Sequence, residues 1–184
     1  MGNQYGLIQG HFDFNLAEEG RKQAVQVTGE IRKLIGKKRP LIFSSDLSRA
    51  WETAAIIAEE LKLNLPIPDR RLRERNMGIL QDKHWTTVDW KQINSPEPKI
   101  SNLETRKEFL GRIGDFVRFV FANKSAIGKT VIAVTHGGTL TFIYHFLLGV
   151  DLDKVPYIGN TEIRVFNLTE ENGKIRGVLE RKNG

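Results

Sequence analysis

The sequence predicts an α/β protein with helices on both faces of a mostly parallel sheet, because short apolar runs alternate with longer segments of helical periodicity. The run Val131–Thr135 is suited to a strand that is buried on both faces, as in parallel sheets. The length of 184 residues fits one domain with a sizeable core. We therefore expect a three-layer α/β/α sandwich, formed by residues 1–184 as a single domain.

The helical segments are marked by apolar residues at three- and four-residue spacing. The first helix is expected from about Glu18 to Ile35 and is ended by the segment Gly36–Pro40. A short strand, Leu41–Ser44, precedes a second helix between Leu47 and Leu61. A long helix is expected to open at a capping box formed by Ser101–Glu104, and another helix is expected over Thr139–Leu148.

The remaining segments carry turn and breaker residues. Leu65–Pro68 is expected to be extended, since proline disfavours helix at itself and at the residue before it. Residues 70–99 mix prolines, glycine and aromatic residues, which indicates an excursion over the sheet edge with a short helix near Trp85–Gln92. The chain is expected to close with a hairpin, Glu162–Leu168 and Lys174–Glu180, that turns through Asn172-Gly173.

Composition excludes several classes of protein. No apolar stretch approaches 20 residues, and no basic start followed by an apolar stretch is present, so we expect neither a membrane span nor a signal peptide. The absence of cysteine excludes disulfides, thiolate metal sites and a cysteine nucleophile. It is compatible with the cytoplasm, which is the location we expect.

The net charge of +6 suggests attraction to anions. The basic residues are scattered apart from the run Arg70–Arg75, and no nucleic-acid-binding module is recognisable. A small phosphorylated substrate and a merely solvated basic surface explain the charge equally well. We expect a small phosphorylated molecule or inorganic phosphate as the partner, and neither nucleic acid nor membrane.

Two residues are candidates for binding an oxyanion. His136 follows a predicted strand and precedes Gly137, Gly138 and a helix, which places it at the carboxyl end of a strand, where open α/β sheets bind ligands. The alternative is a buried histidine that donates to a backbone carbonyl. Arg49 lies early in the helix after Leu41–Ser44 and offers a rigid fork of donors. Its alternative is an exposed arginine on an amphipathic helix.

Glu74 is a candidate general acid, although it lies among four arginines in a loop. A general acid needs a raised pKa, and neighbouring positive charge lowers the pKa until a bound phosphate neutralises it. The alternative is a solvated cluster of ion pairs. His11, His84 and His145 are weaker candidates, expected to be structural or exposed. No pair shows metal-ligand spacing, so we expect no metal and no cofactor.

The order of several motifs resembles the histidine phosphatase (phosphoglycerate-mutase-like) superfamily, including small bacterial-type members such as alpha-ribazole phosphatase. The matching stretches cover nearly the whole chain: Asn3–Gly10, Leu16–Ala24, Ser45–Ala50, Leu72–Gly78, Glu104-Thr105 with Arg112, Val134–Gly138 and Asn160-Thr161. The resemblance implies a phosphatase that acts through a phosphohistidine intermediate. It also implies that Arg49, His136, Gly137 and Asn3 bind phosphate and that Glu74 protonates the leaving oxygen.

The sequence departs from the family pattern at two places. The family's nucleophile lies in Arg-His-Gly at the end of a central apolar strand, and this motif, expected before Met1, does not occur in the 184 residues. Leu80-Gln81-Asp82 stands where the family has Trp-Glu-Gly. We therefore expect a fold without its first central strand and a chain that is inactive or nearly so. The alternatives are a pseudophosphatase that binds a phosphorylated ligand or partner, and an unrelated basic binding protein; the identity of the substrate and a homodimeric state stay open.

Overall fold

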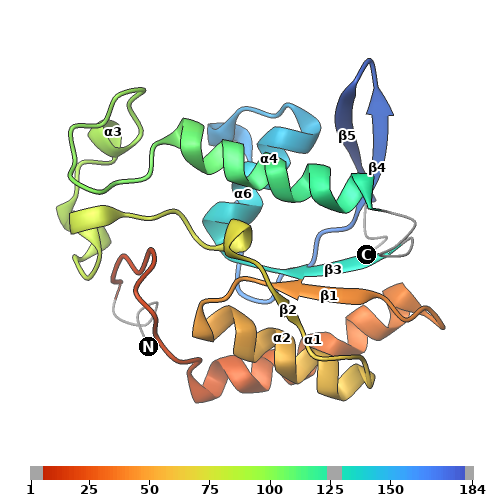
Figure 1. The fold of residues 1–184 in the computed structure, drawn as a ribbon. Helices are drawn as coiled ribbons and strands as arrows, with labels where there is room; N and C mark the ends of the chain where they lie inside the picture. The colour runs from red at the N-terminus through yellow and green to blue at the C-terminus, as the bar shows by residue number, and fades with distance from the viewer. Residues whose placement is uncertain (1–5, 124–129, 181–184) are drawn as a thin grey trace.

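The computed structural model describes residues 6–123 and 130–180, and it has three layers (Figure 1). Helices α1 and α2 cover one face of a central sheet, and α4 and α6 cover the other. This α/β/α arrangement confirms the predicted fold class. The layer helices are α1 (Glu18–Ile35), α2 (Ser48–Leu61), α4 (Arg106–Ala122) and α6 (Gly137–Leu148).

The sheet has three parallel strands in the order β2-β1-β3, with bounds β1 (Leu41–Ser44), β2 (Ile67–Pro68) and β3 (Val131–Val134). In the register, Leu41 pairs with Val131 and Ser44 with Val134. Since the strands are parallel, their carboxyl ends lie at one edge of the sheet, on the left in Figure 1. The loops that follow β1 and β3 therefore meet.

The bounds of α1 and β1 match the predicted ranges. Helix α1 buries Ala24, Val27 and Ile31 on one stripe and ends at Gly36, whose φ of +56° is readily accessible only without a side chain. Its stripe packs against α2, where Ala54 and Ile57 are almost inaccessible to solvent. These two helices form the apolar cluster beneath the sheet.

The capping box of the long helix α4 was predicted at the wrong residues. Thr105 is the N-cap, its hydroxyl accepts from the Glu108 amide, and the Glu108 carboxylate accepts from the Thr105 amide. Ser101 and Asn102 instead form a turn, in which Asn102 has a φ of +59°. Both candidate boxes have the same spacing, and the turn determines which of them opens the helix.

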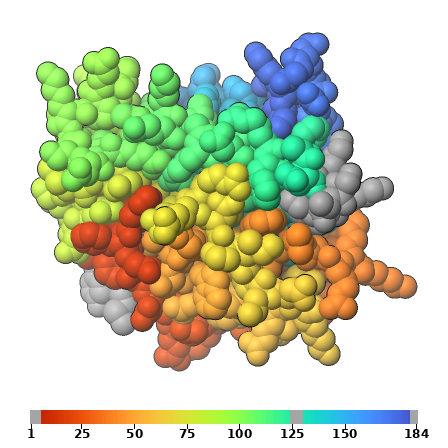
Figure 2. All heavy atoms as spheres, viewed as in Figure 1, coloured from red at the N-terminus to blue at the C-terminus, as the bar shows by residue number. Residues whose placement is uncertain are grey.

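Residues 70–99 form the predicted excursion, which lies against the segment that begins at Gly6 (Figure 2). Isolated bridges join Leu7 to His84 and Met77 to Leu103. The single short helix expected near Trp85–Gln92 is in fact a 3-10 turn followed by α3, because the Asp89 side chain caps α3. The elements of the excursion are 3-10 helices at Arg70–Leu72, Gly78–Leu80 and Trp85–Thr87, and α3 at Trp90–Ile93.

The predicted hairpin and its turn are confirmed, but the first strand begins four residues later and ends three residues later than predicted. Strands β4 (Phe166–Glu171) and β5 (Lys174–Leu179) are antiparallel, and the turn at Asn172 and Gly173 has φ values of +52° and +72°. A two-residue turn of this kind needs positive φ at both positions. A further 3-10 helix spans Leu152–Lys154. No helix among the described residues is long and apolar enough to cross a membrane.

The expectation that Val131–Thr135 is buried on both faces is wrong. β3 lies at the edge of the three-stranded sheet, Ala133 is exposed, and the other residues of the strand are half-buried. The side chains are apolar because both helical layers contact the strand. Ile132 and Val134 pack on the cluster formed by α1 and α2, and Val131 packs with Phe43 and Phe116 on the face covered by α4. The apolar sequence pattern indicates that helices contact both faces of the strand. It does not indicate whether another strand pairs with each of its two edges.

The packing of α4 against α6 makes a testable contribution to stability. Ile113 is 1% exposed and packs with Phe109 and Phe142. We expect Ile113→Ala to lower the free energy of unfolding by about 2–5 kcal/mol, since the alanine leaves a cavity. Ile79→Ala is the control, because Ile79 is 55% exposed and its loss should cost less than about 0.5 kcal/mol. Equal losses in chemical denaturation would contradict this packing.

Candidate functional site

The site lies where β1 and β3 end. Ser45 follows β1 directly, and His136 follows β3 after one intervening residue. The His136 Nε2 atom lies 2.9 Å from the Ser45 hydroxyl, and Ser45 is fully buried. The parallel register therefore brings the Ser45–Ala50 and Val134–Gly138 motifs together, although about 90 residues separate them in sequence.

Arg49 lies in the first turn of α2 and reaches the same place. Its Nη1 and Nη2 atoms donate to the carbonyls of Phe12 and Gly10, at 2.8 and 2.9 Å. Burial lowers the pKa of Arg49, and the charge of Glu74 opposes that shift. A guanidinium has five N–H donors, so the two bonds to the loop do not exhaust its capacity to bind an oxyanion. Arg49, which was predicted to bind phosphate, therefore also holds the loop that contains His11 in place.

Glu74 comes from the excursion and contacts the amino end of α6. One carboxyl oxygen accepts from the Arg75 amide at 2.8 Å, and the other accepts from the Gly138 amide at 3.0 Å. The residue is half-buried, and its carboxyl group is enclosed by protein atoms. An alanine Cβ at Gly138 would collide with this carboxyl group. Glycine at 138 therefore permits the contact.

The local prediction that neighbouring arginines lower the pKa of Glu74 is wrong for this structure. Burial raises the pKa of Glu74, and it outweighs the two amide donors and the charges of Arg49 and Arg112. The four arginines around Glu74 in sequence each have other acceptors: Arg70 and Arg73 pair with Asp46, Arg71 pairs with Asp69, and Arg75 donates to the carbonyls of Ile93 and Glu104. A raised pKa is what a proton donor requires.

His136 has the opposite shift. Burial holds the pKa of His136 well below its ordinary value of 6.5, the cations Arg49 and Arg112 lower it further, and Asp46 opposes them. The imidazole is therefore neutral at neutral pH. Its sequence alternative, a histidine that donates to a backbone carbonyl, does not describe the contact found, which is to a hydroxyl.

Arg112 on α4 holds the excursion in place. Its guanidinium pairs with Glu104 at 2.5 Å and donates to the carbonyls of Arg71, Arg73 and Glu74 at 2.7–2.9 Å. In the sequence, Glu104 and Arg112 were noted only because they resemble a motif of the family. Their spacing of eight residues, with the glutamate outside the helix, gives no local signal that they pair.

His11 is half-buried beside the candidate site, and its contacts are those of a structural histidine, as expected from the sequence. Its Nε2 atom lies 2.8 Å from the Glu74 carbonyl, and its own amide bonds the side chain of Gln81. Burial lowers the pKa of His11, as do Arg73 and Arg112, while the Glu74 carbonyl and Glu104 raise it. The positive charge of a protonated His11 would also lower the pKa of His136. Gly10, which has a φ of +51°, turns the chain immediately before His11.

The other candidates lie elsewhere. His84 caps the 3-10 helix at Trp85–Thr87, and the His145 ring contacts the Val150 carbonyl. Gly137 begins α6 and is exposed, whereas Asn3 lies outside the described residues. No group of three or more potential metal ligands occurs within residues 6–123 and 130–180.

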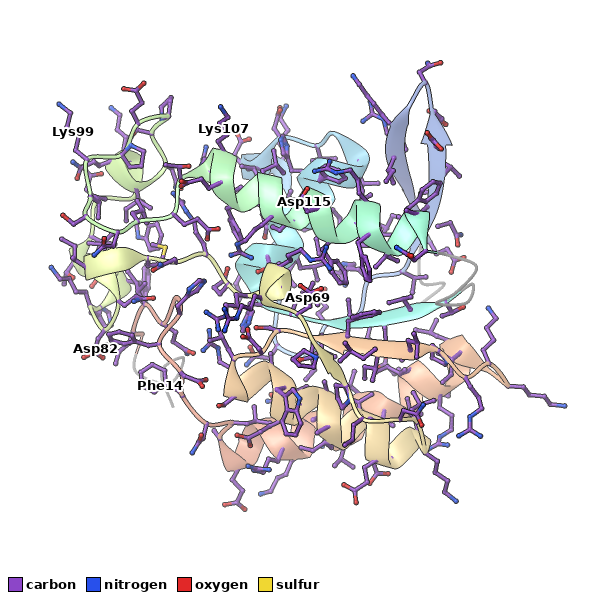
Figure 3. All side chains as sticks on the ribbon, in the orientation of Figure 1. Phe14, Asp69, Asp82, Lys99, Lys107 and Asp115 are labelled. Atoms are coloured by element: carbon purple, nitrogen blue, oxygen red, sulfur yellow. The ribbon has the colours of Figure 1, made fainter. Side chains whose placement is uncertain are left out.

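The side chains at this edge of the molecule converge from four segments that are distant in sequence. In Figure 3, Phe14 and Asp82 mark the loop and the excursion that border the site, and Asp69 marks the carboxyl end of β2. A cavity of about 1700 Å³ opens here and is lined by Arg49, Glu74 and His136, among many apolar residues. Fixed cations, a neutral imidazole and a carboxyl group with a raised pKa together suit binding of an oxyanion and delivery of a proton.

Comparisons with known proteins identify the family to which this chain belongs. The profile of the histidine phosphatase superfamily (branch 1) matches residues 1–180, and the chain belongs to that superfamily. Phosphoglycerate mutase-like protein 4 of Arabidopsis thaliana is 33% identical over 180 residues, which cover 88% of this chain and 72% of that protein.

Two solved structures of mycobacterial glucosyl-3-phosphoglycerate phosphatase are also similar. The complex with VO3 has a TM-score of 0.82 at 27% identity and covers 99% of this chain and 93% of its own. The complex with inorganic phosphate has a TM-score of 0.77 at 26% identity and covers 96% and 91%. Both confirm the phosphoglycerate-mutase-like fold, and both bind a phosphate or a phosphate-like oxyanion.

The raised pKa of Glu74 makes a prediction about stability. The folded protein retains this proton to a pH above the ordinary pKa of 4.5, so it binds more protons than the unfolded chain in that interval. The free energy of unfolding due to this group must therefore fall as the pH rises from about 4.5 through the raised pKa. Glu74→Gln removes the titration. We expect the difference, wild type minus Glu74→Gln, to decline over this interval in chemical denaturation.

His136 titrates in both proteins, so its contribution cancels to first order in that difference. A difference that is flat, or that rises with pH, would show that the folded state favours the charged carboxylate and would contradict the assignment of Glu74 as a buried acid.

Gly138 provides a second test of this geometry. We expect Gly138→Ala to lower the free energy of unfolding by about 0.5–1.5 kcal/mol more than Gly137→Ala does, because the new Cβ displaces the Glu74 carboxyl group from the Gly138 amide. Gly137→Ala is the comparison, since its Cβ would lie 3.6 Å from the nearest described atom, the Ile158 carbonyl oxygen. Similar thermal unfolding of the two variants would show that the Glu74–Gly138 contact is not formed in solution.

Proposed function

We propose that this chain recognises the phosphoryl group of small phosphomonoesters, with Arg49, His136 and the amide of Gly137 as phosphate-binding groups and Glu74 as the proton donor to the leaving oxygen. The proposal depends on one observation: Arg49, His136 and Glu74 converge at the carboxyl ends of β1 and β3, where burial raises the pKa of Glu74. Asn3 belongs to the proposal by resemblance alone.

The chemistry follows from these assignments. A guanidinium and backbone amides stabilise the charge that spreads over the equatorial oxygens during phosphoryl transfer. A protonated Glu74 prevents an alkoxide from leaving unprotonated. The basic net charge of +6 attracts anionic substrates over a longer range. Phosphorylated sugars and glycerates are a reasonable substrate class, given the names of the similar structures, and residues 70–99 border the space where the rest of the substrate would lie.

The attacking group is the missing part of this proposal. The 184 residues contain no Arg-His-Gly, and the two described histidines at the site, His11 and His136, contact a carbonyl and a hydroxyl. The second candidate is a pseudophosphatase that binds a phosphorylated ligand or partner without turning it over. We also propose that residues 1–184 act as one domain in the cytoplasm; a homodimer is compatible with both candidates.

Phosphate binding tests the assignment of the pocket. We expect Arg49→Ala and His136→Ala each to weaken binding of inorganic phosphate by about 10- to 100-fold, which corresponds to a charge-assisted hydrogen bond of about 1.5–3 kcal/mol. Isothermal titration calorimetry measures the affinity. Arg39→Ala is the matched control, because exposed Arg39 precedes β1 at the opposite end of that strand. Unchanged affinity in both pocket variants would refute the proposal.

Hydrolysis tests whether a residue of this chain performs the attack. We expect this 184-residue chain to hydrolyse para-nitrophenyl phosphate at least about 1000-fold more slowly than a superfamily member that contains Arg-His-Gly, since removing a nucleophile costs several orders of magnitude. A comparable rate would show that a residue of this chain performs the attack.

A further inference from the structure

Two threonine hydroxyls beside the candidate site bond the segment that leads to Glu74. The Thr135 hydroxyl donates to the Leu72 carbonyl at 2.7 Å, and the Thr139 hydroxyl donates to the Arg73 carbonyl at 2.9 Å. Thr135 follows β3 directly, and Thr139 lies in the first turn of α6. The end of β3 and the start of α6 therefore hold the backbone of the two residues that precede Glu74.

The hydroxyl of Thr139 makes a different contact from those of other helical threonines. Thr28, Thr53 and Thr141 each donate to the carbonyl four residues earlier in their own segment. A threonine in a helix commonly makes this local bond. Thr139, which is 0% exposed, instead donates to the carbonyl of Arg73, 66 residues away in sequence. Its contact is therefore set by the tertiary structure, and it joins α6 to the excursion.

Arg73 is held at its side chain and at its backbone. Its guanidinium forms two hydrogen bonds of 2.6 Å, one to each carboxylate oxygen of Asp46. Its carbonyl accepts from Arg112 at 2.8 Å as well as from Thr139, so both lone pairs of that oxygen are used. A loop residue bonded in this way has little freedom to move. The direction in which the next residue, Glu74, leaves the loop is therefore fixed.

The contact of Glu74 with α6 depends on that direction. The Glu74 carboxyl group accepts from the Gly138 amide at 3.0 Å, and it lies so close to α6 that a Cβ at Gly138 would collide with it. Hydrogen bonds weaken steeply with distance, so a movement of the loop by about 1 Å would break this contact. Gly138 and Thr139 are adjacent, and one turn of α6 thus binds both the carboxyl group and the backbone that carries it.

We propose that Thr139 is a positioning residue for the proton donor: its hydroxyl, through the Arg73 carbonyl, places the Glu74 carboxyl group against the first turn of α6. Thr135 supports the same segment one residue earlier. The inference rests on the proposed role of Glu74 as proton donor, and it assigns to Thr139 no contact with the substrate.

Replacing Thr139 tests the proposal without removing a charged group of the site. Thr139→Val has nearly the shape of threonine and lacks the hydroxyl, and the Arg73 carbonyl keeps its bond to Arg112. In a freer loop the Glu74 carboxyl group gains contact with water, so we expect its pKa to fall by about 0.5 or more, toward its ordinary value. Carbon-13 NMR of protein labelled at the glutamate carboxyl carbon measures this pKa, and Glu74→Gln identifies the signal.

Two matched variants are the controls. Thr139→Ser retains the hydroxyl and should keep the pKa of Glu74 within about 0.2 of the wild-type value. Thr28→Val removes the hydroxyl of another buried threonine, which donates within α1, and should leave the pKa of Glu74 unchanged. All three variants keep the cations that act on this carboxyl group, Arg49 of α2 and Arg112 of α4. Far-ultraviolet circular dichroism verifies that each variant is folded.

An unchanged pKa of Glu74 in Thr139→Val would overturn the inference, since the loop would then keep its place without the hydroxyl. An equal fall in Thr139→Ser would do the same, because packing of the side chain would be responsible. If Thr139→Val does not fold, Thr135→Val takes its place: it removes the donor to the Leu72 carbonyl and should also lower the pKa, and no fall there would overturn the inference.

The NMR titration needs no bound phosphate, so it is independent of the calorimetric test of the pocket. Loss of phosphate binding in the wild type would refute the proposed function and would leave the response of Glu74 to Thr139→Val as a separate result. A wild-type pKa of Glu74 at its ordinary value would refute the proton donor and, with it, this inference.

Discussion

The guanidinium of Arg112 fixes the geometry on which the site depends. It joins α4 to the carbonyls of Arg71, Arg73 and Glu74, and it pairs with Glu104, which follows the excursion in sequence. Helix α4, which is packed in the core, thereby holds the backbone of the loop that carries Glu74. Glu74 can then meet the amino end of α6 at a defined position, although the loop has little regular structure of its own.

Burial sets the protonation of the site in two directions at once. It raises the pKa of the Glu74 carboxyl group and lowers the pKa of the His136 imidazole, because each neutral form is favoured where water is excluded. The permanent charges at the site then belong to Arg49 and Arg112, both held by backbone carbonyls. Fixed cations beside a carboxyl group with a raised pKa are features that suit the binding of an anion and the delivery of a proton.

The parallel register of β1 and β3 explains why the site lies at one end of the sheet. The loops that follow both strands meet there, so Ser45 and His136 come into contact although they are far apart in sequence.

The sequence by itself determined the class of fold, the bounds of α1 and β1, the hairpin turn and three residues of the site, because helical periodicity, turn residues and strand-end motifs are local signals. Only the tertiary structure decided the capping residue of α4, the edge position of β3, the place of His11 and the pKa of Glu74. Each of these depends on partners distant in the chain. The arginines beside Glu74 in sequence bond Asp46, Asp69 and backbone carbonyls. The local charge pattern therefore predicted the wrong direction for the pKa of Glu74, which burial raises.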